Sequence, residues 1–349
     1  MQIVDLDSMN YVRFLTRTSI MMKTITNNFK RLLLACTLFI ASISVSSAAD
    51  LPKLKIAVLG FGTVLWELDT IKHYGLDIAN GFDLEITKMA SGSASRVAFQ
   101  ANETDAIVAD WLWVAIQKNK GRDYVFAPYS LAVGEMLVPG NSDIRSLKDL
   151  KGKSIGIAGG PLDKSWLIFQ SYAAAKQGFD LKAETEQVFG APPLMFKKAL
   201  SGELDAVINY WHFTAKMKSR GMRSILSVAD TSSALGLDST TPLLGYVFNR
   251  ALPASGSLMP NMVRASQGAK KILLQEQSAW DRLRPLMNAK NDSDFEFLVN
   301  GFRAGVPTEP VNLKSVQAML NIMSKSGGDK LVGELIAVPD DLFYAAKAN

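Results

Sequence analysis

The stretch Leu147–Gly178, which reads LKDLKGKSIGIAGGPLDKSWLIFQSYAAAKQG, decides the predicted fold. Lys153–Ala158 alternates apolar residues as a short strand does, and Gly159-Gly160-Pro161 ends it. From Trp166 onward, apolar residues recur at helical spacing until Gly178. The stretch therefore predicts a strand, a turn and a helix, which together are one βα unit.

The start of this helix is the first candidate position for ligand binding. Asp163 or Ser165 can cap the helix, and Pro161 and Trp166 lie beside them. A helix that begins beyond the carboxyl end of a strand leaves backbone N–H groups unpaired, and ligands of open α/β sheets bind at such positions. An ordinary βα turn explains the same pattern, so both interpretations remain open.

Three similar units precede this one. The expected strands are Leu54–Leu59, Phe82–Met89 and Asp105–Ala109, with helices at 64–75 and 91–101 between them. Consecutive βα units imply a parallel sheet with right-handed crossovers.

The remainder of the chain predicts a second lobe and a helical tail. Further strands are expected at 124–128, 132–138, 186–189, 204–209 and 243–248, and a helix begins at Pro192-Pro193. From Pro260 the pattern is mostly helical. The predicted fold class is α/β with two lobes, each a parallel or mixed sheet flanked by helices, and with a ligand cleft that closes by hinge motion.

These elements suggest domain boundaries. Residues 50–133 form the first part of lobe 1, residues 134–242 form lobe 2, and residues 243–349 form a return strand and helices that pack on lobe 1. Gly134 lies between apolar residues where the chain could leave the first lobe.

The first 49 residues predict a leader with a secretory signal peptide. Met22–Arg31 is basic, Leu32–Val45 is apolar, and small residues follow, so cleavage is expected after Ala48 or Ala49. The apolar segment is too short for a membrane anchor. Export across the inner membrane to the periplasm is therefore expected.

Charge and cysteine content exclude several kinds of protein. The net charge is +5, and residues 1–49 hold five Lys/Arg against two Asp/Glu, so the remainder carries only +2. This balance predicts no nucleic-acid partner. Cys36 is the only cysteine and lies in the leader, so no thiol or disulfide is expected in the mature chain.

Aromatic residues gather after the predicted strands. Five of the six tryptophans fall there, and Phe61 and Tyr210 join them. Several such rings at one cleft suggest an aromatic ligand or a cation, although packing in the cores of the lobes is an equal alternative. The predicted ligand-binding residues are Gly62, Thr63, Trp66, Ser91, Gly92, Ser93, Asp110, Trp111, Trp113, Pro161, Asp163, Trp166, Asn209, Tyr210 and Trp211.

Asp110, at the end of a strand, is the strongest polar candidate, although capping of the next helix explains it equally well. Acidic residues outnumber fixed cations near these loops; the charged residues are Glu67, Asp69, Asp110, Asp163, Arg96 and Lys164. This excess favours a neutral heterocycle or an amine over a simple oxyanion. The hydroxyls of Ser91 and Ser93 could still receive a carboxylate or phosphate.

No metal or other cofactor is predicted. His73 and His212 are the only histidines and do not stand at ligand spacing. Asp110, Asp163 and Glu67 could meet as an oxygen site for a hard cation, which the sequence leaves open.

Three segments in order resemble a known family. They are ANETDAIVAD (101–110), DLKGKSIGIAGGPLDKSWLIFQ (149–170) and APPLMFKKALSGELDAVINYW (191–211). They are similar to type II periplasmic solute-binding proteins, specifically the nitrate/sulfonate/taurine and thiamine-pyrimidine-precursor group, over roughly Leu54–Leu286. Where many relatives carry Trp-Glu or Glu-Pro, this chain has Tyr210-Trp211-His212, which also favours a ligand other than sulfonate or nitrate.

The resemblance implies a monomeric, non-catalytic receptor that delivers a solute to an inner-membrane ABC permease with its ATPase. One alternative is an enzyme similar to the thiamine-pyrimidine synthases, for which Lys164 and His212 are the only counterparts of the family's lysine and histidines. Another alternative is a ligand-sensing subunit of a membrane receptor.

Overall fold

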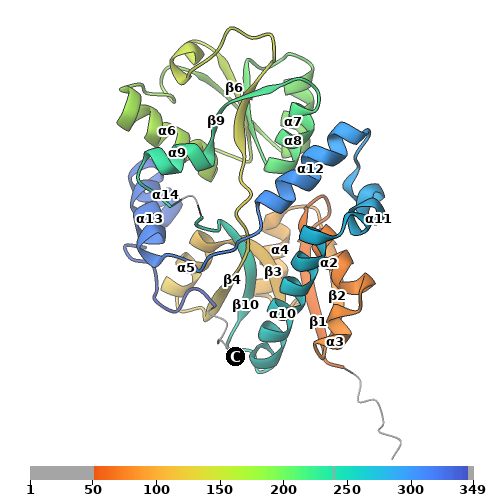
Figure 1. Cartoon of the computed structure of the whole chain (residues 1–349). Helices are drawn as coiled ribbons and strands as arrows, with labels where there is room; N and C mark the ends of the chain where they lie inside the picture. The colour runs from red at the N-terminus through yellow and green to blue at the C-terminus, as the bar shows by residue number, and fades with distance from the viewer. Residues whose placement is uncertain (1–50, 239, 345–349) are drawn as a thin grey trace, which may run out of the picture. The chain divides into compact units, whose positions relative to one another are not determined.

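The computed structural model describes residues 51–238 and 240–344 (Figure 1). They belong to a compact unit that begins at Leu51. The predicted signal peptide, its cleavage sites and Cys36 lie outside the described residues. Among the described helices, none combines the length and apolar character that a membrane span requires.

The first sheet has the strand order β2-β1-β3-β10-β4. β1 pairs in parallel with β2 and β3, whereas β10 runs antiparallel to β3 and β4. The strands are β1 (Lys53–Leu59), β2 (Asp83–Met89), β3 (Ala106–Asp110), β4 (Tyr124–Ser130) and β10 (Leu244–Asn249). The intervening helices are α2 (Val64–His73), α3 (Leu76–Ala79), α4 (Gly92–Gln100) and α5 (Trp111–Asn119). We call this sheet and these helices, together with α10 below, lobe 1.

The second sheet repeats this plan in the order β7-β6-β8-β5-β9, with β5 antiparallel to both neighbours. The strands are β5 (Glu135–Val138), β6 (Ser154–Ala158), β7 (Glu186–Gly190), β8 (Ala206–Asn209) and β9 (Arg223–Ser227). The helices are η1 (Leu147–Leu150), α6 (Lys164–Gln177), α7 (Pro192–Leu200), α8 (Trp211–Lys218) and α9 (Val228–Ala234). We call these elements lobe 2. The sequence did not predict β9, a short edge strand whose residues are mostly half-buried and do not alternate.

The chain crosses from lobe 1 to lobe 2 just before β5. The backbone N–H of Leu131 donates to the carbonyl of Gly305 at 2.7 Å. A Cβ at Gly134 would lie only 2.1 Å from the carbonyl oxygen of Asn209, so this position requires glycine. Because these contacts hold the crossing segment, the strand expected from Ala132 begins at Glu135.

The C-terminal helices pack on both lobes. They are α10 (Ser255–Gln275), α11 (Gln277–Met287), α12 (Asp292–Ala304), α13 (Leu313–Gly327) and α14 (Asp329–Val332). α10 packs on α2 of lobe 1, α12 packs on α8 of lobe 2, and α13 packs on α6 of lobe 2 (Figure 1). The apolar residues of α12 also belong to the hydrophobic cluster of the lobe 1 core, where Phe302 contacts Trp66 and Trp280. The first of these helices begins at Ser255, five residues before the position that the sequence predicted.

Candidate functional site

The carboxyl end of β3 meets the carboxyl end of β6 at the boundary between the lobes. Asp110, the last residue of β3, caps α5 through a hydrogen bond from the Trp113 N–H to Oδ1 (2.9 Å). Its Oδ2 accepts from Arg96 Nη2 of α4 (2.8 Å) and from Lys164 Nζ of α6 (3.3 Å). Because Lys164 belongs to lobe 2, this ion pair joins the two lobes. The sequence noted Arg96 and Lys164 only as nearby charges, and the structure brings them onto Asp110.

Two carboxyl groups at this boundary differ in acidity. Burial would raise the pKa of Asp110, but the charges of Lys164 and Arg96 outweigh it and leave that pKa lowered. Burial raises the pKa of Asp163 to about 6, against the opposing effects of the Trp166 N–H and Lys164. Asp163 caps α6 by accepting from the Trp166 N–H at 3.1 Å. Asp110 is therefore charged at neutral pH. Asp163 gains or loses its proton near pH 6.

The rings at this boundary are of two kinds. Tyr210 and Phe61 are 37% and 39% exposed, which leaves ring surface for a ligand. The Phe61 ring also lies 6.4 Å from that of Phe213 on α8, and Trp66 on α2 lies edge to face with Trp211 on α8 at 5.8 Å. Both pairs join lobe 1 to lobe 2.

Most of the tryptophans that were predicted to bind the ligand are buried in the protein interior. Trp111 and Trp166 are each 1% exposed and belong to a hydrophobic core cluster, and Trp66 is 4% exposed. Trp113 is half-buried, stacks with Tyr124 at 5.8 Å and carries the Arg96 guanidinium over its ring at 5.0 Å. Side chains in the first turn of a helix can point back onto the sheet, so their place after a strand did not determine their exposure.

The remaining predicted residues serve mainly local structure. Ser91 caps α4 by accepting from the Ala94 N–H at 3.1 Å, and the adjacent Gly92 and Ser93 are exposed, as is Pro161. The buried Asn209 side chain donates to the Pro192 carbonyl (3.0 Å) and accepts from the Tyr210 N–H (2.8 Å). Gly62 and the buried Thr63 form the turn after β1.

The charge balance differs from the one that the sequence suggested. Glu67 is fully buried inside lobe 1, where Lys270 Nζ lies 2.8 Å from its Oε2 and the Tyr246 hydroxyl donates to its Oε1 at 2.7 Å. Asp69 pairs with Arg282. The charges that remain at the boundary are Arg96, Lys164, Asp110 and Asp163. Acidic residues therefore do not outnumber cations there.

Several buried polar atoms lack hydrogen-bond partners among the described residues. Trp111 Nε1, His212 Nε2 and Thr241 Oγ1 are among them. Trp111 follows Asp110 directly, His212 lies in the first turn of α8, and Thr241 lies just before β10, where Leu244 pairs with Asp110. Sequence reasoning had no signal for Thr241. Within the described range, no group of three or more His, Cys, Asp or Glu side chains could hold a metal ion.

Comparison with known proteins agrees with this fold. The sulfonate-binding protein SsuA of Escherichia coli matches with 16% identity and a TM-score of 0.66 over 84% of this chain and 97% of its own. SsuA of Xanthomonas axonopodis pv. citri, solved with MOPS, matches with 16% identity and a TM-score of 0.64 over 85% and 99%. The zinc-bound ligand-binding component of a Staphylococcus aureus ABC-type import system matches with 13% identity and a TM-score of 0.61 over 84% and 96%.

The fold is thus the two-lobe fold of periplasmic binding proteins, as expected. The model of the NMT1/THI5-like family matches residues 78–267, more than half of the sequence, so the chain belongs to this family. The resemblance noted in the sequence is thereby confirmed. No curated protein matches the chain.

Proposed function

We propose that the chain is the solute-binding component of an ABC-type importer, and that it binds a small organic solute between lobes 1 and 2. The observation that carries this proposal is the ion pair between Asp110 and Lys164, which joins the lobes beside the exposed Tyr210 ring. A solute that contacts both sides of such a boundary can stabilise the closed arrangement of two hinged lobes.

The ligand chemistry follows from which polar atoms are still free. Both Asp110 oxygens already accept hydrogen bonds, so this carboxylate is less open to an amine. Arg96 and Lys164 have further N–H groups and are about one-third exposed. A simple oxyanion is less suited because Asp110 already neutralises part of their charge. A flat heterocycle with acceptor atoms, resting on Tyr210 and Phe61, fits best.

The surroundings of His212 and Lys164 favour ligand binding without catalysis. Burial lowers the pKa of His212 to about 3, with Lys216 adding to the effect, so this imidazole stays neutral and is a poor acid or base near pH 7. Lys164 is held in its ion pair with Asp110. Of the two side chains considered for the enzyme alternative, one is therefore a neutral buried imidazole and the other is engaged by a carboxylate.

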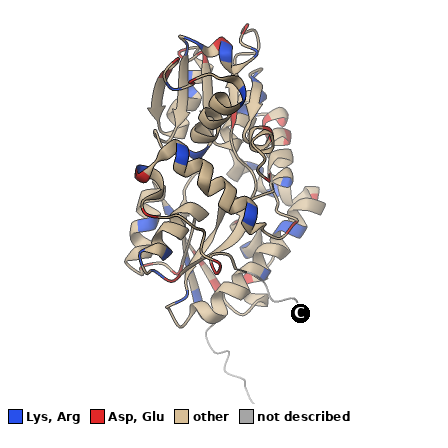
Figure 2. Cartoon of the chain, turned by 90° about the vertical axis from the view of Figure 1, so that its left-hand side faces the viewer, with Lys and Arg blue, Asp and Glu red and all other residues tan. Residues whose placement is uncertain are grey.

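The proposal includes the compartment and partners that the sequence suggested. After cleavage near Ala48 or Ala49 the mature chain would act in the periplasm as a monomer and deliver its solute to an inner-membrane permease with its ATPase. In Figure 2, the backbone positions of Lys and Arg are interspersed with those of Asp and Glu.

Native mass spectrometry tests the binding role. The protein purified from its own periplasm is compared with a sample that has been unfolded, dialysed and refolded. A discrete added mass that disappears on refolding is expected, and that mass identifies the solute. The Asp110→Asn/Lys164→Met variant, purified in the same way, should lose the added mass. An added mass retained by this variant would place the solute elsewhere, and no added mass in any periplasmic preparation would argue against the binding role.

A further inference from the structure

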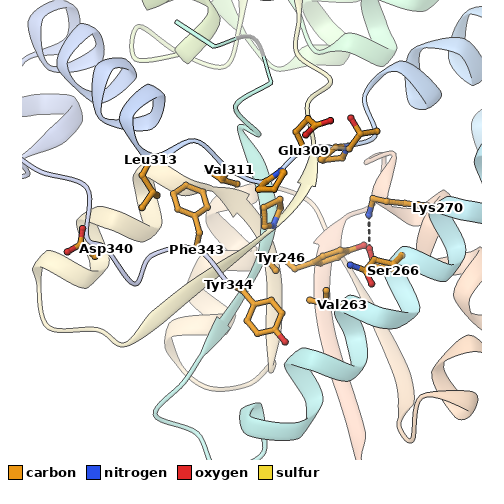
Figure 3. Close-up of a pocket in the computed structure, with 16 residues that line it drawn as sticks. Tyr246, Val263, Ser266, Lys270, Glu309, Val311, Leu313, Asp340, Phe343 and Tyr344 are labelled. Atoms are coloured by element: carbon orange, nitrogen blue, oxygen red, sulfur yellow. Dashed lines mark hydrogen bonds between the residues drawn. The ribbon is translucent and has the colours of Figure 1, made fainter. Parts of the chain in front are cut away.

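A cavity of about 560 Å³ lies between lobe 1, the segment 307–313 and the C-terminal segment (Figure 3). Its floor is formed by Ala127 and Pro128 of β4 and Tyr246 of β10. None of the residues that we place at the interlobe boundary lines it. Its volume falls within the range of small-molecule sites, roughly 300–1,000 Å³.

The walls of this cavity come from three segments that local structure holds in place. Val263, Ser266, Gln267 and Lys270 of α10 line one side, at spacings that put them on one face of the helix. Opposite them, Phe343 and Tyr344 are held because the C-terminal segment pairs with β4. The Phe126 N–H donates to the Leu342 carbonyl, and the Tyr344 N–H donates to the Phe126 carbonyl, both at 2.8 Å.

The loop at 307–313 completes the wall between α12 and α13. It contributes Pro307, Thr308, Glu309, Pro310, Val311 and Leu313. The two prolines restrict the backbone of this loop.

The electrostatic balance of the lining is negative. Lys270 is the one cation among the lining residues, but its Nζ lies 2.8 Å from Glu67 Oε2 and donates to Ser266 Oγ at 2.6 Å. Glu67 therefore neutralises it. The other charged lining residues are Glu309 and Asp340, and the described part of the chain offers neither of them an ion-pair partner within 4.0 Å.

We infer that this cavity is a second ligand site, separate from the interlobe site, and that it takes a small organic cation with a flat apolar body. The rings of Phe343 and Tyr344 offer apolar surface and π-faces that attract a cation, whereas the Tyr246 ring already has Lys270 Nζ 5.8 Å from its centroid. The negative charges of Glu309 and Asp340 also attract a cationic ligand over a longer distance. An anion would meet these two carboxylates and a lysine whose charge Glu67 already neutralises.

Three probes that share a phenyl ring but differ in charge test this inference: one is a cation, one is neutral and one is an anion. Benzylamine, benzyl alcohol and benzoate are titrated at pH 7 against the whole protein, with affinity measured by ligand-observed NMR. Benzylamine is expected to bind at least about fivefold more tightly than the other two. Glu309→Gln/Asp340→Asn should weaken benzylamine by roughly three- to tenfold and leave benzyl alcohol unchanged.

Two further variants locate the binding. Gln267→Trp, at an exposed position of α10, fills the cavity and should abolish binding of all three probes. Glu103→Gln, an exposed acid in the turn after α4, is the matched control and should bind as the parent does. Benzoate binding as tightly as benzylamine would overturn the inference. Unchanged benzylamine binding in Gln267→Trp, or no binding by the parent, would do the same.

Discussion

Two polar clusters in this protein are built from the same chemical groups but lie in different surroundings. Glu67 is fully buried, and its partners Lys270 and Tyr246 belong to lobe 1 alone. Asp110 pairs with Arg96 of lobe 1 and Lys164 of lobe 2, and the side chains of both cations are about one-third exposed.

The difference separates a structural cluster from a functional one. Opening the Glu67 pair would leave a charge inside the core, which is costly. Opening the contact between Asp110, which is 13% exposed, and Lys164, which is 29% exposed, costs less because Arg96 still pairs with Asp110. The Asp110 contact therefore lies between the lobes, whereas the Glu67 cluster lies within lobe 1.

The largest expected effect comes from breaking the buried cluster. Glu67→Ala leaves Lys270 unpaired in the core and should lower the free energy of unfolding by about 3–5 kcal/mol in urea denaturation. Glu67→Ala combined with Lys270→Met removes both charges and should recover most of that loss. A single variant that costs less than about 1 kcal/mol would contradict the structural role of this cluster.

Trp111 and Tyr210 should separate stability from binding. Trp111→Ala removes a side chain that is 1% exposed and should cost about 3 kcal/mol or more in the free energy of unfolding. Tyr210→Ala should cost less than about 1 kcal/mol, yet weaken solute affinity by about tenfold through lost ring contact. Urea denaturation and tryptophan fluorescence titration measure the two quantities. Equal effects of both variants on stability would remove the distinction between core and accessible rings.

The pH dependence of stability should reveal Asp163. Its pKa is about 6 in the folded protein and near 3.8 in the unfolded chain, so the folded state binds more protons between these values. This residue therefore favours folding at low pH, and its contribution is lost as pH rises from about 4 to 6. The change is at most about 3 kcal/mol.

Asp163→Asn is the matched variant, because asparagine also caps a helix. Relative to this variant, the parent should lose stability between pH 4 and pH 7 in parallel urea denaturation series. Parallel curves for the two proteins would show that Asp163 does not titrate in this range. Lys164, Asp110 and Tyr210 are the charged or titratable groups that affect it or are affected by it.

The smallest stability effect is expected at the contact between the lobes. Lys164→Met removes the ion pair with Asp110. Because Asp110 keeps its contacts with Arg96 and the Trp113 N–H, the free energy of unfolding should change by less than about 1 kcal/mol. The exposed Lys148→Met is the control. A loss above about 2 kcal/mol would mean that this ion pair is structural in the way that the Glu67 cluster is.

The βα units and helix caps were predictable because they depend on residues close together in the chain. The strand at 154–158, the turn after it and capping by Asp163 follow from alternation, glycine and a side-chain acceptor within one stretch. The edge strand β9 was missed because half-buried residues carry no clear alternation. The contact of α13 with α6 of lobe 2 could not be read from the sequence, because an amphipathic helix does not specify which partner covers its apolar face.

The sequence by itself determined the α/β class, the repeated units and the positions where ligand-facing loops begin, since hydrophobic periodicity and turn residues act locally. Only the tertiary structure decided which of those loop residues are buried and which charges meet. Glu67 and Asp110 look alike in the sequence, each an acid shortly after a strand. Lys270, far along the chain, neutralises the first inside one lobe, whereas Lys164 reaches the second from the other lobe.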